Sequence, residues 1–262
     1  MTSSHVMTEA KGDVAIVRIN RPERMNALSA ETVRALHAAL NDAASSSRCI
    51  LLTGTERAFC SGADLASGDP VPSDSEGPDL GASLETGYNP LLLAMRDLPV
   101  PIVAAVNGPA AGIGCSLALA CDLIVAGRNA YFLQAFSRIG LVPDGGAAFL
   151  LAAAAGKARA MEAMLLAEKI PAETALAWGL INRIAADDSV ESVGLDLAQR
   201  LAAGPTRALG LTRRAAWSAL ESGFETHLDR ERIDQRTAGR TGDFAEGVTA
   251  FLEKRPARFT GH

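Results

Sequence analysis

The chain has 262 residues, of which 48% are hydrophobic, and a formal net charge of −5. This length and composition are enough to bury the core of one large domain or two small ones. The acidic balance, without any long basic run, argues against a broad surface for nucleic acid or for an anionic membrane. No stretch approaches the roughly 18 uninterrupted apolar residues of a membrane span, and residues 1–13 lack a secretory signal pattern. We therefore expect a cytoplasmic protein with no nucleic-acid or membrane partner.

The first half of the sequence alternates strand and helix signals. Apolar runs at 14–19, 49–53 and 101–106 predict strands, and the periodicity of 30–43 predicts a helix for which Ser29 is the expected N-cap. A further helix is expected to start at the glycines of 112–114 and to continue to residue 121. Residues 66–90 are rich in Gly, Pro, Ser and Asp and predict a mobile surface loop. Together these signals indicate an α/β fold with a sheet buried by helices.

In the second half, strand signals nearly vanish after residue 157. Pro171 and Pro205 stand where helices are expected to begin. The predicted helices cover residues 159–166, 172–178, 190–203, 207–222, 224–239 and 244–253. We expect a core region at 1–200 that carries the active site, followed by a helical region at 201–262.

Four cysteines are few for a chain of this length, and they lie in or beside apolar stretches. Reduced, buried thiols fit this placement better than disulfides do. They are Cys49, Cys60, Cys115 and Cys121.

The glycine-rich stretch at 107–116, NGPAAGIGCS, has three interpretations. Its glycines do not follow the dinucleotide-binding order, and no Lys-Ser or Lys-Thr follows them as in a phosphate-binding loop. Ser116 lies in a near match to the G-x-S-x-G motif of serine hydrolases, with Asp196 and His227 as the available partners. The third interpretation is an oxyanion hole, in which small residues let a carbonyl oxygen approach backbone N–H groups.

A second turn of small residues, at 60–65, follows the strand-like pair at 58–59 and offers another backbone donor for such an oxyanion hole. The histidines form no pattern typical of a metal site. No metal is therefore expected.

Several segments together resemble the crotonase, or enoyl-CoA hydratase/isomerase, superfamily. The similarity covers nearly the whole chain, in the expected order and spacing. It is carried by 20–28 (NRPERMNAL), 58–65 (AFCSGADL), 104–108 (AAVNG), 120–122 (ACD), 156–161 (GKARAM), 177–180 (AWGL) and 246–254 (EGVTAFLEK).

The resemblance implies an α/β crotonase fold of repeated β-β-α units. It also implies a helical C-terminal region that serves oligomerisation and caps the site, and assembly as a homotrimer or as a hexamer of two trimers. The implied substrate is an acyl-CoA thioester, with no cofactor beyond its CoA moiety. Carried over by motif, the oxyanion-binding N–H groups belong to Ala63 and Ile113.

Typical hydratases of this family carry two glutamates, at positions that hold Ser116 and Phe136 here. Hydration needs one group to deprotonate water and another to protonate carbon, and these two side chains do neither in the usual way. Asp144, in the run GLVPDGG at 140–146, resembles the single acid of the family's enoyl-CoA isomerases. An apolar setting would raise its pKa, and Leu141, Val142, Phe136 and Phe149 are the expected walls. The alternative for Asp144 is an ordinary turn residue that caps the following helix.

Segments 78–82, 84–91 and 136–144 narrow the resemblance to the family's epoxyphenylacetyl-CoA isomerases. The expected activity is therefore acyl-CoA isomerisation, by shift of a double bond or rearrangement of a ring epoxide, with Asp144 as proton shuttle. A hydratase, a non-catalytic acyl-CoA-binding protein and a serine hydrolase that uses Ser116 are the alternatives. The expected contacts to substrate and CoA are Arg24, Ala27, Leu28, Asp64, Leu65, Phe136, Phe251 and Lys254.

Overall fold

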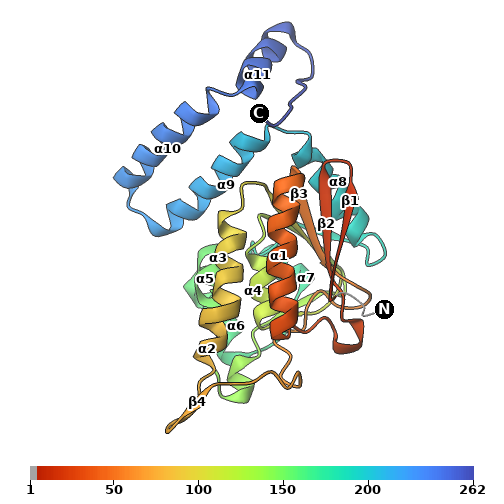
Figure 1. Ribbon diagram of the computed structural model, residues 1–262, viewed down its shortest axis with the longest axis vertical. Helices are drawn as coiled ribbons and strands as arrows, with labels where there is room; N and C mark the ends of the chain where they lie inside the picture. The colour runs from red at the N-terminus through yellow and green to blue at the C-terminus, as the bar shows by residue number, and fades with distance from the viewer. Residues whose placement is uncertain (1–4) are drawn as a thin grey trace.

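The computed structural model describes residues 5–262 and has a six-stranded central sheet (Figure 1). Its order is β1-β2-β3-β6-β8-β11, and all neighbours are parallel except β1 and β2. The strands are β1 (Val6–Lys11), β2 (Val14–Ile19), β3 (Cys49–Gly54), β6 (Ile102–Val106), β8 (Leu123–Gly127) and β11 (Arg183–Ala185). The three predicted strands are confirmed as β2, β3 and β6. Strand β1 was not predicted because it is an edge strand that is mostly exposed, with Val6 as its one buried residue.

Helices cover both faces of this sheet, which explains why its inner strands are apolar throughout. Helix α8 (Val190–Ala202) packs on one face, against side chains such as Ile16 and Leu51. Helices α1 (Ala30–Ser46) and α3 (Asn89–Asp97) cover the other face, where Val17 and Leu52 point. The predicted N-cap of α1 is confirmed, because the Ser29 hydroxyl accepts from the N–H of Thr32 at 3.2 Å.

The expectation of a loop as far as Pro90 is wrong from Gly81 onward. A short hairpin of β4 (Ser73–Asp74) and β5 (Gly77–Pro78) is followed by an unbroken helical segment. This segment runs through α2 (Gly81–Ser83) and the π-helical turn η2 (Leu84–Tyr88) into α3. Proline lacks the N–H that an α-helix uses and crowds the preceding turn, so a π-turn just before Pro90 allows the helix to continue. The Gly and Pro content of this segment therefore led to a loop prediction where the chain forms a helix.

A smaller three-stranded sheet and several short helices adjoin the central sheet. Its order is β10-β9-β7, formed by β10 (Ile170–Pro171), β9 (Tyr131–Leu133) and β7 (Ala110–Ala111). The remaining elements of this part are η1 (Pro22–Arg24), α4 (Ile113–Leu119), η3 (Phe136–Ile139), α5 (Ala147–Ala155), α6 (Lys157–Leu166) and α7 (Ala172–Ala177). Every residue of α4 is buried, so this helix fixes the turns at its two ends.

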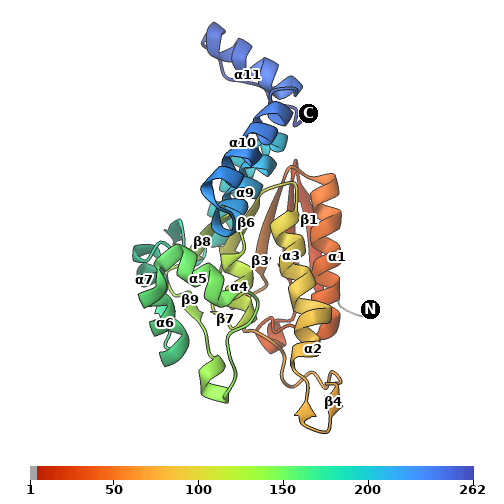
Figure 2. The same ribbon diagram turned by 90° about the vertical axis from the view of Figure 1, so that its left-hand side faces the viewer.

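The last three helices leave the sheet and extend the molecule at one end (Figures 1 and 2). They are α9 (Thr206–Glu221), α10 (Phe224–Ala238) and α11 (Gly242–Glu253), which start and end within two residues of the predicted helices. In both views α11 lies at the end opposite the β4 hairpin. None of the helices within residues 5–262 is long and apolar enough to cross a membrane.

All four cysteines are buried free thiols, as predicted. Burial raises the pKa of Cys49, Cys60 and Cys115 to about 12, so these thiols stay protonated and unreactive.

Candidate active site

Two glycine turns meet at the start of α4. The Cys60 N–H donates to the Pro109 carbonyl at 3.0 Å, and the Ala111 N–H donates to the Cys60 carbonyl at 2.9 Å. Gly62 and Gly112 both have positive φ, and a Cβ added to Gly112 would lie 3.8 Å from the Gly62 Cα. This close approach brings the residues that follow them, Ala63 and Ile113, next to each other. The structure thus unites the two predicted backbone donors.

Both backbone donors are free. Within residues 5–262, no protein acceptor takes a hydrogen bond from the N–H of Ala63 or from that of Ile113. Ile113 is the first residue of α4, and its N-cap Gly112 has no side chain to occupy this N–H. Two adjacent unpaired donors can bind a carbonyl oxygen on which negative charge develops. The geometry has the form of an oxyanion hole.

Asp144 lies beside the same point of α4 because two glycines follow it. Gly145 and Gly146 have φ of +57° and +73°. A Cβ added to Gly145 would meet the Ile113 Cδ1 at 2.2 Å and the Ser116 Cβ at 3.1 Å. The Ile113 Cδ1 is the end of a flexible side chain and can shift, so the positive φ and the Ser116 Cβ are the stronger reasons for a glycine here. The contact places the Asp144 backbone against the residue that carries one of the two free donors.

The Asp144 carboxyl group is partly buried, and one of its oxygens is unpaired within the described residues. Its Oδ1 is buried and has no hydrogen-bond partner among the described residues. Burial raises its pKa from 3.8 to about 6. Helix α5 begins with Gly146 as N-cap and has no side-chain cap, so the capping alternative for Asp144 is wrong. A carboxylate in this state can accept and return a proton near neutral pH.

The expected apolar walls around Asp144 are only partly present. Phe136 is half-buried and comes within 3.6 Å of a Cβ added to Gly112, so it does line the meeting point of the turns. Val142 is 80% exposed and does not form a wall within this chain. Tyr88 was missed; its hydroxyl donates to the Leu28 carbonyl at 3.2 Å, and burial together with the negative charge of Asp144 raises its pKa. The π-turn that carries Tyr88 has no sequence signal.

The serine hydrolase arrangement is not assembled. Ser116 is fully buried, and its hydroxyl donates to the Asp144 carbonyl at 3.1 Å. His227 instead faces Glu231 on α10, with 3.4 Å between Nε2 and Oε1. No histidine of the described chain hydrogen-bonds to Ser116. Ser116 therefore supports the Asp144 turn.

Four of the expected substrate contacts surround Ala63. The Leu28 N–H donates to the Gly62 carbonyl at 2.8 Å, and the Asp64 N–H donates to the Leu28 carbonyl at 2.9 Å. Ala27 and Leu28 are buried, whereas Leu65 is 78% exposed. Nearby, Arg24 is exposed at the end of η1.

The Asp64 carboxylate forms a buried ion pair with Arg21, with 2.8 Å between Oδ2 and Nη2. This pair holds the turn in place. Arg21 also donates to the Ala27 carbonyl at 2.7 Å. The sequence analysis did not predict a role for Arg21, because its position in the sequence pattern does not indicate burial.

Two expected contacts lie elsewhere. Phe251 is 81% exposed on α11, and Lys254 follows the end of that helix. Both views place α11 far from α4, at the outer end of the C-terminal helices (Figures 1 and 2). Within one chain, the structure does not bring Phe251 or Lys254 to Asp144.

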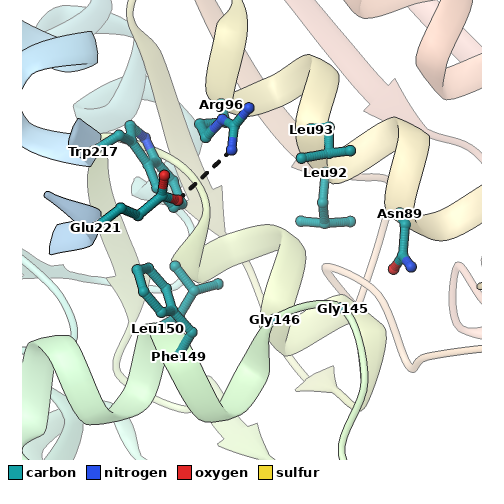
Figure 3. A pocket seen from close by; sticks show the side chains of 10 residues that line it. All are labelled: Asn89, Leu92, Leu93, Arg96, Gly145, Gly146, Phe149, Leu150, Trp217 and Glu221. Atoms are coloured by element: carbon teal, nitrogen blue, oxygen red, sulfur yellow. Dashed lines mark ion pairs between the residues drawn. The ribbon is translucent and has the colours of Figure 1, made fainter.

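A cavity of about 300 Å³ borders Gly145 and Gly146, which follow Asp144 (Figure 3). It lies between α3, α5 and α9, which are distant in sequence, and the sequence analysis did not predict it. Its lining consists of Asn89, Leu92, Leu93, Arg96, Gly145, Gly146, Phe149, Leu150, Trp217 and Glu221. No cluster of three or more His, Cys, Asp or Glu side chains suited to a metal ion occurs in residues 5–262.

The chain matches known proteins along its whole length. Residues 9–262 match the family model described as enoyl-CoA hydratase/isomerase. A protein of Escherichia coli K12 named 1,2-epoxyphenylacetyl-CoA isomerase is 43% identical over 258 residues, with 98% of each chain covered. A probable enoyl-CoA hydratase of Rhodobacter capsulatus is 44% identical over 261 residues, with both chains covered completely. Among solved structures, a putative enoyl-CoA hydratase/isomerase of Mycobacterium abscessus superposes with a TM-score of 0.89 at 32% identity, covering 98% of this chain and 100% of that one.

Proposed function

Because the chain belongs to the enoyl-CoA hydratase/isomerase family and has the crotonase fold, we propose that it is an acyl-CoA isomerase with Asp144 as its single acid-base group. The observation that carries the proposal is the Asp144 carboxyl group itself. It is partly buried, has an unpaired Oδ1, and has a pKa of about 6 beside two free backbone donors. The proposed reaction moves a double bond from the β,γ to the α,β position of an acyl-CoA thioester.

In this mechanism the thioester oxygen accepts hydrogen bonds from the N–H groups of Ala63 and Ile113. These donors stabilise the negative charge that develops when a proton leaves the α-carbon, and loss of one such donor typically costs about 3 kcal/mol. The Asp144 carboxylate takes the α-proton, which leaves a dienolate. The same carboxyl group returns the proton to the γ-carbon. The proton count is unchanged, and no redox cofactor is needed.

The side chains around the two turns favour this one-base reaction over hydration. Water addition needs a base for water and an acid for the α-carbon. The Ser116 hydroxyl is committed to the Asp144 carbonyl, and Phe136 has no proton to give. The Asp64 carboxylate is paired with Arg21. A hydratase that uses Asp144 alone with an ordered water is the alternative that the name of the Rhodobacter relative favours.

Rearrangement of a ring-epoxide acyl-CoA is the second candidate reaction. The name of the Escherichia coli relative, 43% identical over 98% of both chains, favours it. The same residues would serve, since enolate formation beside a thioester again requires the two N–H donors and one base.

We further propose that CoA binds along Arg24, Ala27, Leu28, Asp64 and Leu65, next to the Ala63 donor, with Phe136 lining the acyl end. Phe251 and Lys254 would reach the CoA of a neighbouring subunit in a homotrimer or a hexamer. Phe251 is 81% exposed, which leaves it accessible to a neighbouring subunit.

One product analysis separates the candidate reactions. Wild type, Asp144→Asn and Ser116→Ala are each incubated with a 3-enoyl-CoA, a 2-enoyl-CoA and a ring-epoxide acyl-CoA, and products are identified by mass spectrometry and chromatography. The proposal predicts conversion of 3-enoyl-CoA to 2-enoyl-CoA by wild type and a loss of about 10³-fold in Asp144→Asn. Ser116→Ala should lose less than about tenfold, because the Asp144 carbonyl keeps its hydrogen bond from the Ala147 N–H. A hydrated product as the main product would favour the hydratase. Binding without any turnover would indicate a non-catalytic acyl-CoA-binding protein, and free acid that depends on Ser116 would indicate a hydrolase.

A further inference from the structure

Leu28 holds the turn that carries the Ala63 donor from both sides. Its N–H donates to the Gly62 carbonyl at 2.8 Å, and its carbonyl accepts from the Asp64 N–H at 2.9 Å. These two bonds form an isolated parallel bridge between Leu28 and Ala63. Because the bonds go to the residues before and after Ala63, the N–H of Ala63 itself points away from Leu28. The position of Leu28 therefore sets the direction of this donor.

Tyr88 ties Leu28 to the helical segment that leads into α3. Its hydroxyl donates to the Leu28 carbonyl at 3.2 Å. Its ring packs against the hydrophobic core to which Leu91 and Met95 of α3 belong. A tyrosine side chain has only two torsions, so a packed ring holds the hydroxyl at its end in a fixed place. Tyr88 therefore fixes Leu28 relative to α3.

The π-turn η2 ends at Tyr88 and gives this residue the register of α3. The Asn89 N–H donates to the Leu84 carbonyl, which lies five residues back and makes the turn wider than an α-helical one. Tyr88 then lies three residues before Leu91 and seven before Met95, both of which are buried. This spacing puts the three side chains on one face of the helix. The wide turn thus ends where the tyrosine ring can join the core.

The hydrogen-bond partner of the Tyr88 hydroxyl is the oxyanion turn and not Asp144. Burial, followed by the negative charge of Asp144, raises the pKa of Tyr88, so the hydroxyl keeps its proton and remains a donor at neutral pH. The Leu28 carbonyl also accepts from the Asp64 N–H, so removal of the hydroxyl leaves no buried acceptor unpaired. Its loss should loosen the turn at little cost to folding.

We propose that Tyr88 is a positioning residue of the oxyanion hole: through the Leu28 carbonyl, its hydroxyl keeps the Ala63 N–H aimed at the thioester oxygen. This inference rests on the proposed acyl-CoA isomerase function, because it takes the thioester oxygen to bind between Ala63 and Ile113. Tyr88 acts without touching the substrate. A displacement of about 1 Å in a catalytic site can cost about 10²-fold in rate, so a single remote hydrogen bond can matter.

The test measures the polarisation of a bound thioester carbonyl, which needs no turnover. Hexanoyl-CoA labelled with carbon-13 at the carbonyl is saturated and cannot isomerise, and difference infrared spectroscopy records its carbonyl stretch free and bound. Hydrogen bonds from two N–H donors weaken the C=O bond and lower this frequency. Wild type should show a downshift. Tyr88→Phe, which loses only the hydroxyl, should show a smaller one, with Kd within about twofold of wild type.

The same displacement should appear in kcat and not in KM. With a 3-enoyl-CoA, Tyr88→Phe should lower kcat about tenfold and change KM less than about twofold, because the substrate still binds while its developing charge is stabilised less well. The midpoint of the pH profile of kcat/KM should stay at about 6, since Asp144 is untouched. The Tm should stay within about 4 °C of wild type.

Tyr131→Phe is the matched control. Tyr131 is the other tyrosine of the chain, and its ring lies against Lys169. This variant should keep the carbonyl frequency and kcat of wild type. A wild-type downshift in Tyr88→Phe would overturn the inference and leave the isomerase proposal intact. A full downshift with a lower kcat and a displaced midpoint would assign the hydroxyl to Asp144 and would overturn it equally.

The spectroscopic measurement also separates failure of the inference from failure of the proposed function. A wild type that polarises the carbonyl but isomerises no ester would contradict the isomerase proposal, and the frequencies in wild type and Tyr88→Phe would still decide the role of Tyr88. A wild type without any downshift would contradict the oxyanion hole and overturn the inference with it.

Discussion

Gly145 is the residue on which the position of Asp144 depends. It has positive φ, and an added Cβ would lie 2.2 Å from the flexible end of Ile113 and 3.1 Å from the Ser116 Cβ. Gly145→Ala should therefore destabilise the fold by about 2–3 kcal/mol and displace the carboxylate. Gly140→Ala is the matched control, because Gly140 has φ of +72° but nothing within 4 Å of its added Cβ. Urea unfolding should show a loss of only about 1 kcal/mol for the control. Equal losses in the two variants would contradict the packing explanation.

The raised pKa of Asp144 predicts the pH dependence of the reaction. Proton removal requires the ionised carboxylate, so activity is low below the pKa of the free enzyme. We expect kcat/KM for a 3-enoyl-CoA to rise with pH, with a midpoint of about 6, and to level off above pH 7. A stopped-flow profile between pH 4.5 and 8.5 measures it. A nearly flat profile over this range, as a carboxyl group with the ordinary pKa of 3.8 would give, would show that burial does not control Asp144.

The same burial predicts a pH-dependent gain in stability when Asp144 is neutralised. The folded-state pKa, about 6, is higher than the ordinary value of 3.8. Below pH 3.8 both states hold the proton, and the burial cost appears as pH rises from there through 6. A pKa difference of this size corresponds to at most about 3 kcal/mol, and partial exposure reduces this to about 1–2 kcal/mol. Asp144→Asn should be more stable than wild type by that amount at pH 8 and equal to it near pH 3.5, as measured by urea unfolding. A gain independent of pH would contradict this origin.

Among the contacts between secondary-structure elements, those of Arg213 join the C-terminal helix α9 to the core of the protein. Its nearly buried guanidinium, on α9, donates to the carbonyls of Met95 and Leu98 at the end of α3. It also pairs with Asp122 at 2.9 Å. The cavity lies between α3 and α9, so this contact also fixes two of its walls.

Arg213→Met should cost about 3 kcal/mol in urea unfolding, because Asp122 and the carbonyls lose a buried charged donor. Arg214→Met is the control, since Arg214 is 44% exposed and lies 3.6 Å from Asp234. A loss of less than 1 kcal/mol for Arg214→Met is expected. A loss as small for Arg213→Met would show that α9 docks without this contact.

Local sequence patterns predicted those strands and helices that are determined by the residues of their own segment. The inner strands are apolar because both of their faces are buried. The start of α1 is marked by Ser29, whose side chain caps the helix. Edge strand β1 and the π-turn before Pro90 depend on partners that the local sequence does not reveal.

The same division holds for the site. The two donor turns and Asp144 carry motifs, so they could be predicted. The Arg21–Asp64 pair, Tyr88 and the cavity arise from contacts between distant segments and could not be.

In the molecule as a whole, the C-terminal helices expose many large apolar side chains that nothing in the same chain covers. The exposed side chains on α10 and α11 include Phe224, Leu228, Ile233, Phe244, Val248, Phe251 and Leu252. Apolar patches of this kind mark association surfaces. The proposed homotrimer or hexamer would cover them and bring Phe251 to a neighbouring active site.

Light scattering should therefore give the mass of three or six chains of 27.2 kDa. Phe251→Asp should lower this mass or raise KM for CoA esters about tenfold. Val71→Asp is the control, because Val71 is 46% exposed in the loop before the β4 hairpin. A monomeric wild type with full activity would contradict the proposed assembly.

In the proposed mechanism the Asp144 carboxyl group alone moves the proton. Single-turnover isomerisation of a 3-enoyl-CoA, followed by the absorbance of the conjugated product, tests it in wild type and Asp144→Asn, with Kd for a saturated acyl-CoA measured on both. The predicted result is a rate about 10³-fold lower in Asp144→Asn, within the range for loss of an acid-base group, and an unchanged Kd. Isomerisation by Asp144→Asn at a rate close to that of wild type would contradict the claim.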